Sequence, residues 1–286
     1  MLHIFGCPMY CGVGEKGKGI AHSIEFLQNR YKELDMTVIP EVRIEGENPG
    51  NLKNLNSVIA TCNAIAQYSY NHILKKGDMP IFIGGDHAAA MGTVSAAGAY
   101  NKDIGLIWVD AHPDINTDAT SVTGNIHGMP VAALLGKGEP SLTRFLTDDA
   151  KVKPENIVMI GLRDIDPPEA VTLKELNIKY YTYDVVKERG LDACLDESIQ
   201  YLSHLKNVHI SYDLDSTNPK ILPGVSVPVE DGFTIPEIYT LFNRYFSELP
   251  VTSLDIVEFN AELDKDEKTS EFLMEFLDFV KKFYSK

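Results

Sequence analysis

Short segments that are almost entirely apolar recur along the chain, and longer amphipathic segments separate them. This composition is typical of strands that helices cover on both faces, because neither face of such a parallel sheet meets water. The expected strands are Leu2–Phe5, Thr37–Ile39, Pro80–Ile83, Ile104–Val109, Ile157–Ile160, Ile178–Tyr183, Val208–Tyr212 and Thr252–Val257. The clearest helical patterns are His22–Glu33, Leu52–Lys75, Leu191–Leu205, Pro236–Phe246 and Ser270–Phe283. The alternation of strand and helix predicts a single α/β domain over residues 1–286.

The acidic balance of the chain limits its partners. The formal net charge is −15, whereas a nucleic-acid partner requires a concentrated cationic surface. An anionic membrane surface is disfavoured for the same reason. A cationic small-molecule substrate is compatible with this charge, although acidic side chains usually serve solubility alone. We therefore expect neither a nucleic-acid nor a membrane partner.

Cysteine usage and the first residues indicate the cytoplasm. The four cysteines, Cys7, Cys11, Cys62 and Cys194, are few and scattered, so no disulfide framework is expected. The opening segment MLHIFGCPMYCG lacks a basic leader followed by a long apolar stretch, as a signal peptide would have. No apolar run approaches the length of a membrane span.

A glycine-rich segment follows the first expected strand. Gly12–Gly17 matches the pattern G-x-G-x-x-G, which can bind a dinucleotide pyrophosphate where it forms a tight turn between strand and helix. Here Gly6–Cys11 separates the strand from the first glycine. We therefore interpret the segment as a flexible surface connection.

Three of the expected strands run directly into histidine and carboxylate residues. The three segments are Ile81–His87, Leu106–Asp114 and His209–Asp215. Residues i and i+2 of an extended chain point the same way. Asp110 and His112 are therefore expected to converge, with Asp114 following if the chain stays extended. Asp213 and Asp215 are expected to converge in the same way.

Together with His87, these segments supply four carboxylates and two imidazoles. Four ionised carboxylates cannot sit together without compensation, and two divalent cations would provide it. An oxygen-rich set without thiolates favours manganese, while zinc, iron and cobalt remain possible. Two metal ions about 3.5–4 Å apart can lower the pKa of a shared water enough to give hydroxide near neutral pH. A single aspartate at a strand end is usually a cap or turn former, but three such segments favour a metal site.

One further histidine has a suggestive context. His127 lies in the polar loop Thr123–Gly128, shortly after the second metal segment. An imidazole there could move protons to and from the site. The alternative is a structural residue at the start of a helix.

Taken together, the segments resemble the ureohydrolase superfamily, and in detail its arginase family. The matching motifs are Gly84–His87, Asp110–Asn116, Gly161–Pro167, Ser211–Asp215 and Leu254–Asn260. The resemblance implies a three-layer αβα sandwich around an eight-stranded, mostly parallel sheet. It also implies two Mn²⁺ per subunit, hydrolysis of L-arginine to L-ornithine and urea, and a homo-oligomer, either a trimer or a hexamer.

The resemblance further implies roles for individual residues. One manganese would be held by His87, Asp110, Asp114 and Asp213, and the other by Asp110, His112, Asp213 and Asp215. A hydroxide bridging the metals would attack the guanidinium carbon, and Asp114 would orient it and pass a proton to the leaving amine. His127 would shuttle protons, and Glu258 would pair with the guanidinium. The groups on the α-carbon of the substrate would be bound by Asn116, Thr123, Asn125 and Asp166.

The sequence departs from the family pattern in places. Thr123 stands where serine is usual, Asn218 replaces an aspartate, and Val227 replaces a threonine near the guanidinium. The segment Gly12–Leu34 also lacks the usual pattern of the family. Two alternatives therefore remain open, which are hydrolysis of agmatine or another guanidino compound, and a non-catalytic metal-binding relative.

Overall fold

A parallel β-sheet forms the centre of the protein in the computed structural model, which describes residues 1–46 and 50–284. Its eight strands lie in the order β2-β1-β3-β8-β7-β4-β5-β6, and every neighbouring pair is parallel. The strands are β1 (Leu2–Gly6), β2 (Thr37–Val38), β3 (Met79–Ile83), β4 (Gly105–Val109), β5 (Ile157–Leu162), β6 (Lys179–Thr182), β7 (Val208–Asp213) and β8 (Val251–Val257). All eight expected strands are confirmed.

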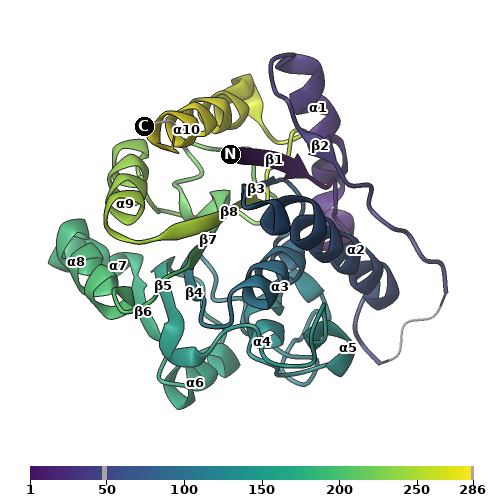
Figure 1. Ribbon diagram of the computed structural model, residues 1–286, viewed down its shortest axis with the longest axis horizontal. Coiled ribbons are helices and arrows are strands. Elements are labelled where there is room, and N and C mark those ends of the chain that lie inside the picture. Colours follow the sequence, from purple (N-terminus) through teal and green to yellow (C-terminus); the bar gives the residue numbers. More distant parts are fainter. Residues whose placement is uncertain (47–49, 285–286) are drawn as a thin grey trace.

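Helices cover both faces of the sheet. They are α1 (Ser23–Arg30), α2 (Leu55–Tyr68), α3 (Ala90–Tyr100), α4 (Pro130–Leu134), α5 (Pro140–Thr143), α6 (Pro167–Glu175), α7 (Tyr183–Arg189), α8 (Leu191–Leu202), α9 (Ile235–Glu248) and α10 (Lys268–Tyr284). Helices α9 and α10 lie on one side of the sheet and α2 and α3 on the other (Figure 1). The αβα sandwich is therefore confirmed. No helix in the described part of the chain is both long and apolar enough to cross a bilayer.

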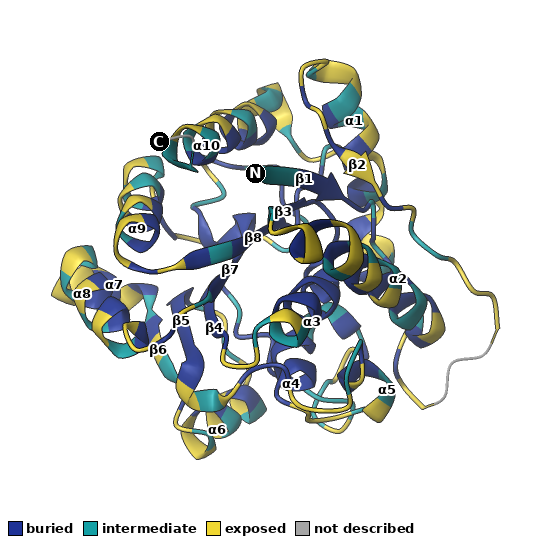
Figure 2. Ribbon diagram, viewed as in Figure 1, coloured by how far each residue is buried: buried dark blue, intermediate teal, exposed yellow. Residues whose placement is uncertain are grey.

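Strand β4 illustrates why the expected strands are apolar throughout. All five of its residues are buried. Ile107 and Val109 join the core beneath α7–α10, whereas Leu106 and Trp108 join the core beneath α3 and α6. Because successive side chains of a strand point to opposite faces, both faces must be apolar. Figure 2 shows the central strands mostly in dark blue and exposed residues in yellow along the surrounding helices, whereas the edge strand β2 is exposed.

The prediction that the glycine-rich segment Gly12–Gly17 is a flexible surface connection is wrong. The backbone N–H groups of Gly12 and Val13 donate to Asp86 Oδ2 at 2.7 and 3.1 Å, and a 3₁₀ helix, Gly14–His22, begins directly afterwards. A Cβ atom at Gly12 would lie 2.5 Å from Asp86 Oδ1. Glycine is therefore required at position 12, because a side chain there would collide with the buried Asp86 carboxylate.

The segment Leu52–Lys75, which was expected to be one helix, is divided into three helical elements. Helix α2 begins after Asn54, which has a φ of +54°. A π-helical turn at Ser69–Ile73 and a 3₁₀ turn at Leu74–Lys76 follow it. Hydrophobic periodicity does not distinguish these turn types over so few residues.

Helix α10 docks on the sheet through Phe276, whose ring lies 4.6 Å from that of Phe242 and 5.6 Å from that of Tyr212. Phe276→Ala should lower the free energy of unfolding by about 3–5 kcal/mol, because it removes a fully buried ring. Urea unfolding followed by circular dichroism measures this change. Glu275→Ala, at the neighbouring exposed position, should change it by less than about 0.5 kcal/mol. A similar loss in both variants would contradict this account of docking.

Candidate metal centre and substrate pocket

The predicted site residues gather at one edge of the sheet, at the carboxyl ends of four adjacent strands. Asp110 directly follows β4, Asp213 is the last residue of β7, and Glu258 directly follows β8. His87 begins a 3₁₀ turn just beyond β3. Loops at this edge of a parallel sheet are where α/β proteins place their ligands.

A first group of ligating atoms surrounds the imidazole of His87. Its Nδ1 atom lies 2.9 Å from Asp110 Oδ2 and 3.2 Å from both Asp114 Oδ2 and Asp213 Oδ2. In the described part of the chain, neither His87 Nδ1 nor Asp110 Oδ2 has a hydrogen-bond partner, although both are buried. Buried polar atoms are almost always paired in proteins. A cation held by these atoms would satisfy both of them.

A second group lies beside the first. His112 Nδ1 is 3.0 Å from Asp215 Oδ2 and 3.5 Å from Asp110 Oδ1. Asp110 therefore presents one oxygen to each group, and the geometry of each group is compatible with a metal ion. The donor set, carboxylates and imidazoles without a thiolate, fits a pair of divalent cations.

The electrostatics of the cluster point to the same requirement. Burial raises the pKa of Asp213 well above its usual value, and repulsion by Asp215 and Asp110 raises it further. Burial also raises the pKa of Asp215 to about 6, although His112 partly offsets this. Burial opposes ionisation of Asp110 too, but His112 and His87 hold its pKa below the usual range. Cations would be needed for all the carboxylates to ionise together near neutral pH.

The sequence predicted that these residues would converge along an extended chain. In the structure they converge through tight turns instead. The N–H of His112 donates to Asp110 Oδ1 at 2.6 Å, and the N–H of Asp215 donates to Asp213 Oδ1 at 2.7 Å. Asp114 has a φ of +47°, a region that L-residues rarely adopt. The residues converge because short aspartate side chains accept the amide two positions further on.

The orientation of His87 depends on two residues that the sequence reasoning missed. His87 Nε2 lies 2.9 Å from Ser211 Oγ, and its ring stacks on Trp108, with centroids 3.9 Å apart and an interplanar angle of 7°. Trp108 and Ser211 lie two residues before Asp110 and Asp213. Because residues i and i+2 of a strand point the same way, both side chains lie on the same side of their strands as the aspartates.

Behind Ser211 lies a buried polar network, which sequence reasoning also missed. Asp255 Oδ2 accepts hydrogen bonds from Thr93 Oγ1 at 2.6 Å and Ser211 Oγ at 3.5 Å, and it lies 2.9 Å from His209 Nε2. His209 was not among the residues expected at the site. The available signal was a histidine within a buried strand; the register places Ser253 opposite it and Asp255 two residues further along β8.

A pocket of about 300 Å³ lies above the two groups of ligating atoms. It is lined by Asp114, Asn116, Thr123, Asn125, His127, Asp166 and Glu258, together with His112, Asp213, Asp215 and others. All the residues predicted to bind substrate therefore share one cavity. His87 and Asp110 are fully buried beneath it.

Glu258 is held so that one carboxylate oxygen has no protein partner. Its Oε1 accepts the N–H of His87 at 2.9 Å and lies 3.4 Å from His127 Nδ1. Its Oε2 is buried and unpaired in the described part of the chain. The residue has a φ of +65°, and such backbone strain is concentrated at functional sites. Glu258 Oε2 is thus available to a cationic ligand.

The far side of the pocket is ordered by a second carboxylate, which sequence reasoning did not single out. Glu169 accepts the N–H groups of Ile115 and Asp166, both at 3.0 Å, and burial raises its pKa to about 7. Asn116 Nδ2 donates to Asp166 Oδ2 at 3.1 Å.

Two residues that depart from the family pattern lie in different places. Val227 lines the pocket, whereas the side chain of Asn218 accepts the N–H of Lys220.

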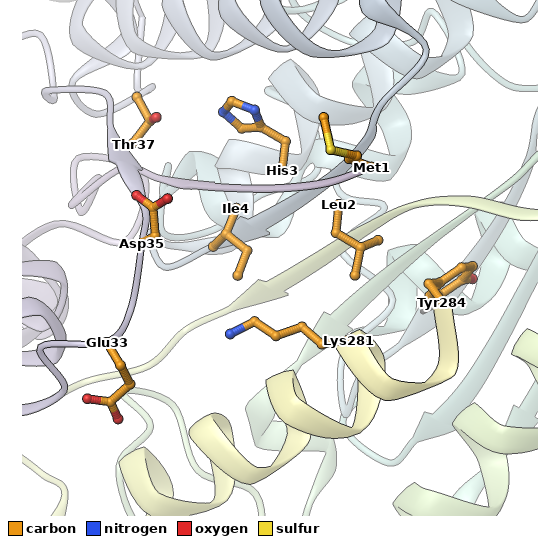
Figure 3. Close-up of a pocket in the computed structure, with 9 residues that line it drawn as sticks. All are labelled: Met1, Leu2, His3, Ile4, Glu33, Asp35, Thr37, Lys281 and Tyr284. Carbon is orange, nitrogen blue, oxygen red and sulfur yellow. The ribbon is translucent and has the colours of Figure 1, made fainter. Parts of the chain in front are cut away.

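A larger cavity, of about 600 Å³, lies at the amino end of β1. Figure 3 shows Lys281 extending from α10 toward the side of the cavity where Glu33 and Asp35 lie. None of the predicted site residues lines it. The cavity at the carboxyl ends of the strands is therefore the candidate site.

The Arginase family model matches residues 4–279. The chain belongs to the arginase family. It is 36% identical to an arginase of Bacillus subtilis over 285 residues, which cover 97% of this chain and 96% of that protein. An arginase of Bacillus caldovelox is 35% identical, with 94% of each chain covered.

Solved structures agree with this assignment. The crystal structure of the arginase from Bacillus subtilis has a TM-score of 0.86 and 34% identity, with 97% of each chain covered. A formimidoylglutamase from Bacillus subtilis has a TM-score of 0.73 at 18% identity. That second likeness shows the shared fold alone.

Trp108 is the only tryptophan of the chain, and it stacks on His87. Adding Mn²⁺ to the metal-free protein should therefore quench the tryptophan fluorescence, because a paramagnetic ion would lie beside the stacked pair. The titration should saturate near two equivalents per chain. Asp110→Asn should weaken the response, because it removes charge from both groups, whereas Asp148→Asn, at an exposed position, should not. Metal bound at two equivalents without a fluorescence change would contradict this placement.

Proposed function

We propose that this chain hydrolyses the guanidinium group of L-arginine to L-ornithine and urea. The observation that carries the proposal is the shared position of Asp110 between two His/Asp groups, directly beneath a pocket where Glu258 Oε2 is unpaired. Membership of the arginase family supports it. The chain acts as a metallohydrolase on the C–N bonds of linear amidines.

The residues suited to hold two divalent cations are those of the two groups. We assign His87, Asp110, Asp114 and Asp213 to one ion, and Asp110, His112, Asp213 and Asp215 to the other. Manganese is our choice because the donors are mostly carboxylate oxygens. When bound, the two cations would lower the pKa of water enough for it to act as a nucleophile near neutral pH.

The protein side chains would position the substrate and move the protons. Glu258 Oε2 would accept hydrogen bonds from the guanidinium, which places the guanidinium carbon above the metal ligands. Asp114 would take a proton from the attacking water and deliver it to the nitrogen that leaves with ornithine. The C–N bond to that nitrogen breaks, the second proton of the attacking water passes to the released amine, and neutral urea leaves beside ornithine with a protonated side-chain amine. His127, which is one-fifth exposed, would exchange protons between the site and solvent.

The α-carbon end of the substrate would be bound by the far side of the pocket. Asn116, Thr123 and Asn125 would donate hydrogen bonds to the α-carboxylate, and Asp166 would pair with the α-ammonium. Agmatine lacks the carboxylate and would leave these polar groups unpaired. A site built to hydrogen-bond a substrate group discriminates strongly against an analogue without it.

Two further features belong to this proposal. We infer that the chain assembles as a homo-oligomer, a trimer or hexamer, as the family resemblance implies. We also infer a cytoplasmic location, which agrees with four buried free cysteines.

Urea release by the manganese-loaded protein, measured over a panel of guanidino compounds, tests the proposal. L-arginine should give the highest kcat/KM of the panel, and agmatine a value at least about 100-fold lower. Asp114→Asn should lower kcat by about 10²–10⁴-fold, because it removes the group that carries the proton. Metal analysis must accompany this variant, since Asp114 is also assigned as a ligand.

Asp148→Asn makes the same chemical change at an exposed position outside the pocket and should leave kcat unaltered. If the metal-loaded wild-type protein released no urea from L-arginine, the proposal would be wrong. A higher kcat/KM for agmatine than for L-arginine would replace it with the agmatinase alternative.

A further inference from the structure

We propose that Lys53 sets the preference of this site for substrates that carry an α-carboxylate, by orienting the amide of Asn125 and placing a positive charge behind it. The inference rests on the proposed function. Lys53 lies just before α2 and does not line the substrate pocket. It contacts Gly124 and Asn125 of the loop beside the pocket.

The contact between Lys53 and Asn125 fixes which way the amide faces. Lys53 Nζ lies 3.1 Å from Asn125 Oδ1. An ammonium group can only donate hydrogen bonds, so it must face the amide oxygen. The Nδ2 group of Asn125 therefore faces away from Lys53. Asn125 lines both the substrate pocket and the neighbouring hollow in which Lys53 lies. This arrangement presents an N–H donor, and not a carbonyl oxygen, to a carboxylate in the pocket.

The backbone of Lys53 holds the same loop in place. Its N–H donates to the carbonyl oxygen of Gly124 at 2.9 Å. Gly124 has a φ of +69°, and a Cβ atom there would lie 2.0 Å from the carbonyl oxygen of Asn51. The segment of Asn51 to Lys53 is therefore packed closely against Gly124. Because this backbone contact does not use the side chain, a side-chain substitution at Lys53 should leave the loop in position.

The charges around the pocket explain why a cation at this point matters. The pocket lining contains Asp114, Asp164, Asp166, Glu169, Asp213, Asp215 and Glu258. Among the described lining residues there is no lysine or arginine. An α-carboxylate therefore approaches a strongly acidic surface, and Lys53 is a cation that touches a residue expected to bind it. Since Lys53 is exposed, solvent screens its charge, and we expect a moderate effect.

Lys53→Met tests the inference, because it keeps the apolar stem and removes the charge and the donor. The KM for L-arginine should rise about tenfold, and kcat should change less than twofold, since Lys53 lies away from the reacting atoms. Calorimetry should show a similar loss of affinity for L-ornithine and less than a twofold loss for putrescine, which lacks the carboxylate. Lys53→Arg should recover part of the affinity for L-ornithine.

Lys16→Met is the matched control, because Lys16 lines the same hollow as Lys53 but makes no described contact with Asn125. It should leave the KM for L-arginine within twofold of the wild-type value. Equal losses for L-ornithine and putrescine in Lys53→Met would overturn the inference, because they would indicate a displaced loop. Unchanged affinity for both ligands would overturn it as well.

The two proposals fail in distinguishable ways. If the wild-type protein releases no urea from L-arginine, the proposed function fails. If it does release urea and Lys53→Met keeps the wild-type KM, only the role of Lys53 fails.

Discussion

The buried carboxylate of Asp110 governs the arrangement of the whole site. It has no exposed surface, and its two oxygens face two different imidazoles, those of His87 and His112. Three further carboxylates lie around the same point. Such a cluster is electrostatically unfavourable in a buried setting unless cations accompany it. The packing of the aspartates thus favours bound cations at this point.

The sheet makes this unfavourable packing possible. Strands β3, β8, β7 and β4 lie side by side, and each ends at the same edge, so every strand contributes a site residue without a long connection. Helices on both faces bury these four strands almost completely. That rigidity holds Asp114 and Glu258 in backbone conformations with positive φ, which an isolated loop would relax. We assign proton transfer to Asp114 and guanidinium binding to Glu258.

The outline of the fold could be predicted from the sequence, and so could the gathering of the candidate site residues at one edge of the sheet, but the local geometry could not. Uniformly apolar segments such as Leu106–Val109 predicted strands covered on both sides, because that pattern has few other physical explanations. The motifs at the strand ends predicted which side chains would meet. The turn that brings Asp215 toward Asp213 depends on a side-chain hydrogen bond, which periodicity does not encode. The packing of Gly12 on Asp86 depends on residues 74 positions apart.

Some residues of the site could not be predicted from the sequence because they make their contacts with distant segments of the chain. In the sequence, Lys53 is an ordinary polar residue before a helix. Its contact with Asn125 joins residues that lie 72 positions apart. His209 and Asp255 lie 46 positions apart and meet only because β7 and β8 are neighbours.

A crystal structure of the manganese-loaded protein, with an anomalous difference map recorded near the manganese absorption edge, tests the central claim most directly. We expect two peaks of similar height, one on each side of the Asp110 carboxylate, with His87 beside one and His112 beside the other. A single peak, or two peaks that do not share Asp110, would contradict it.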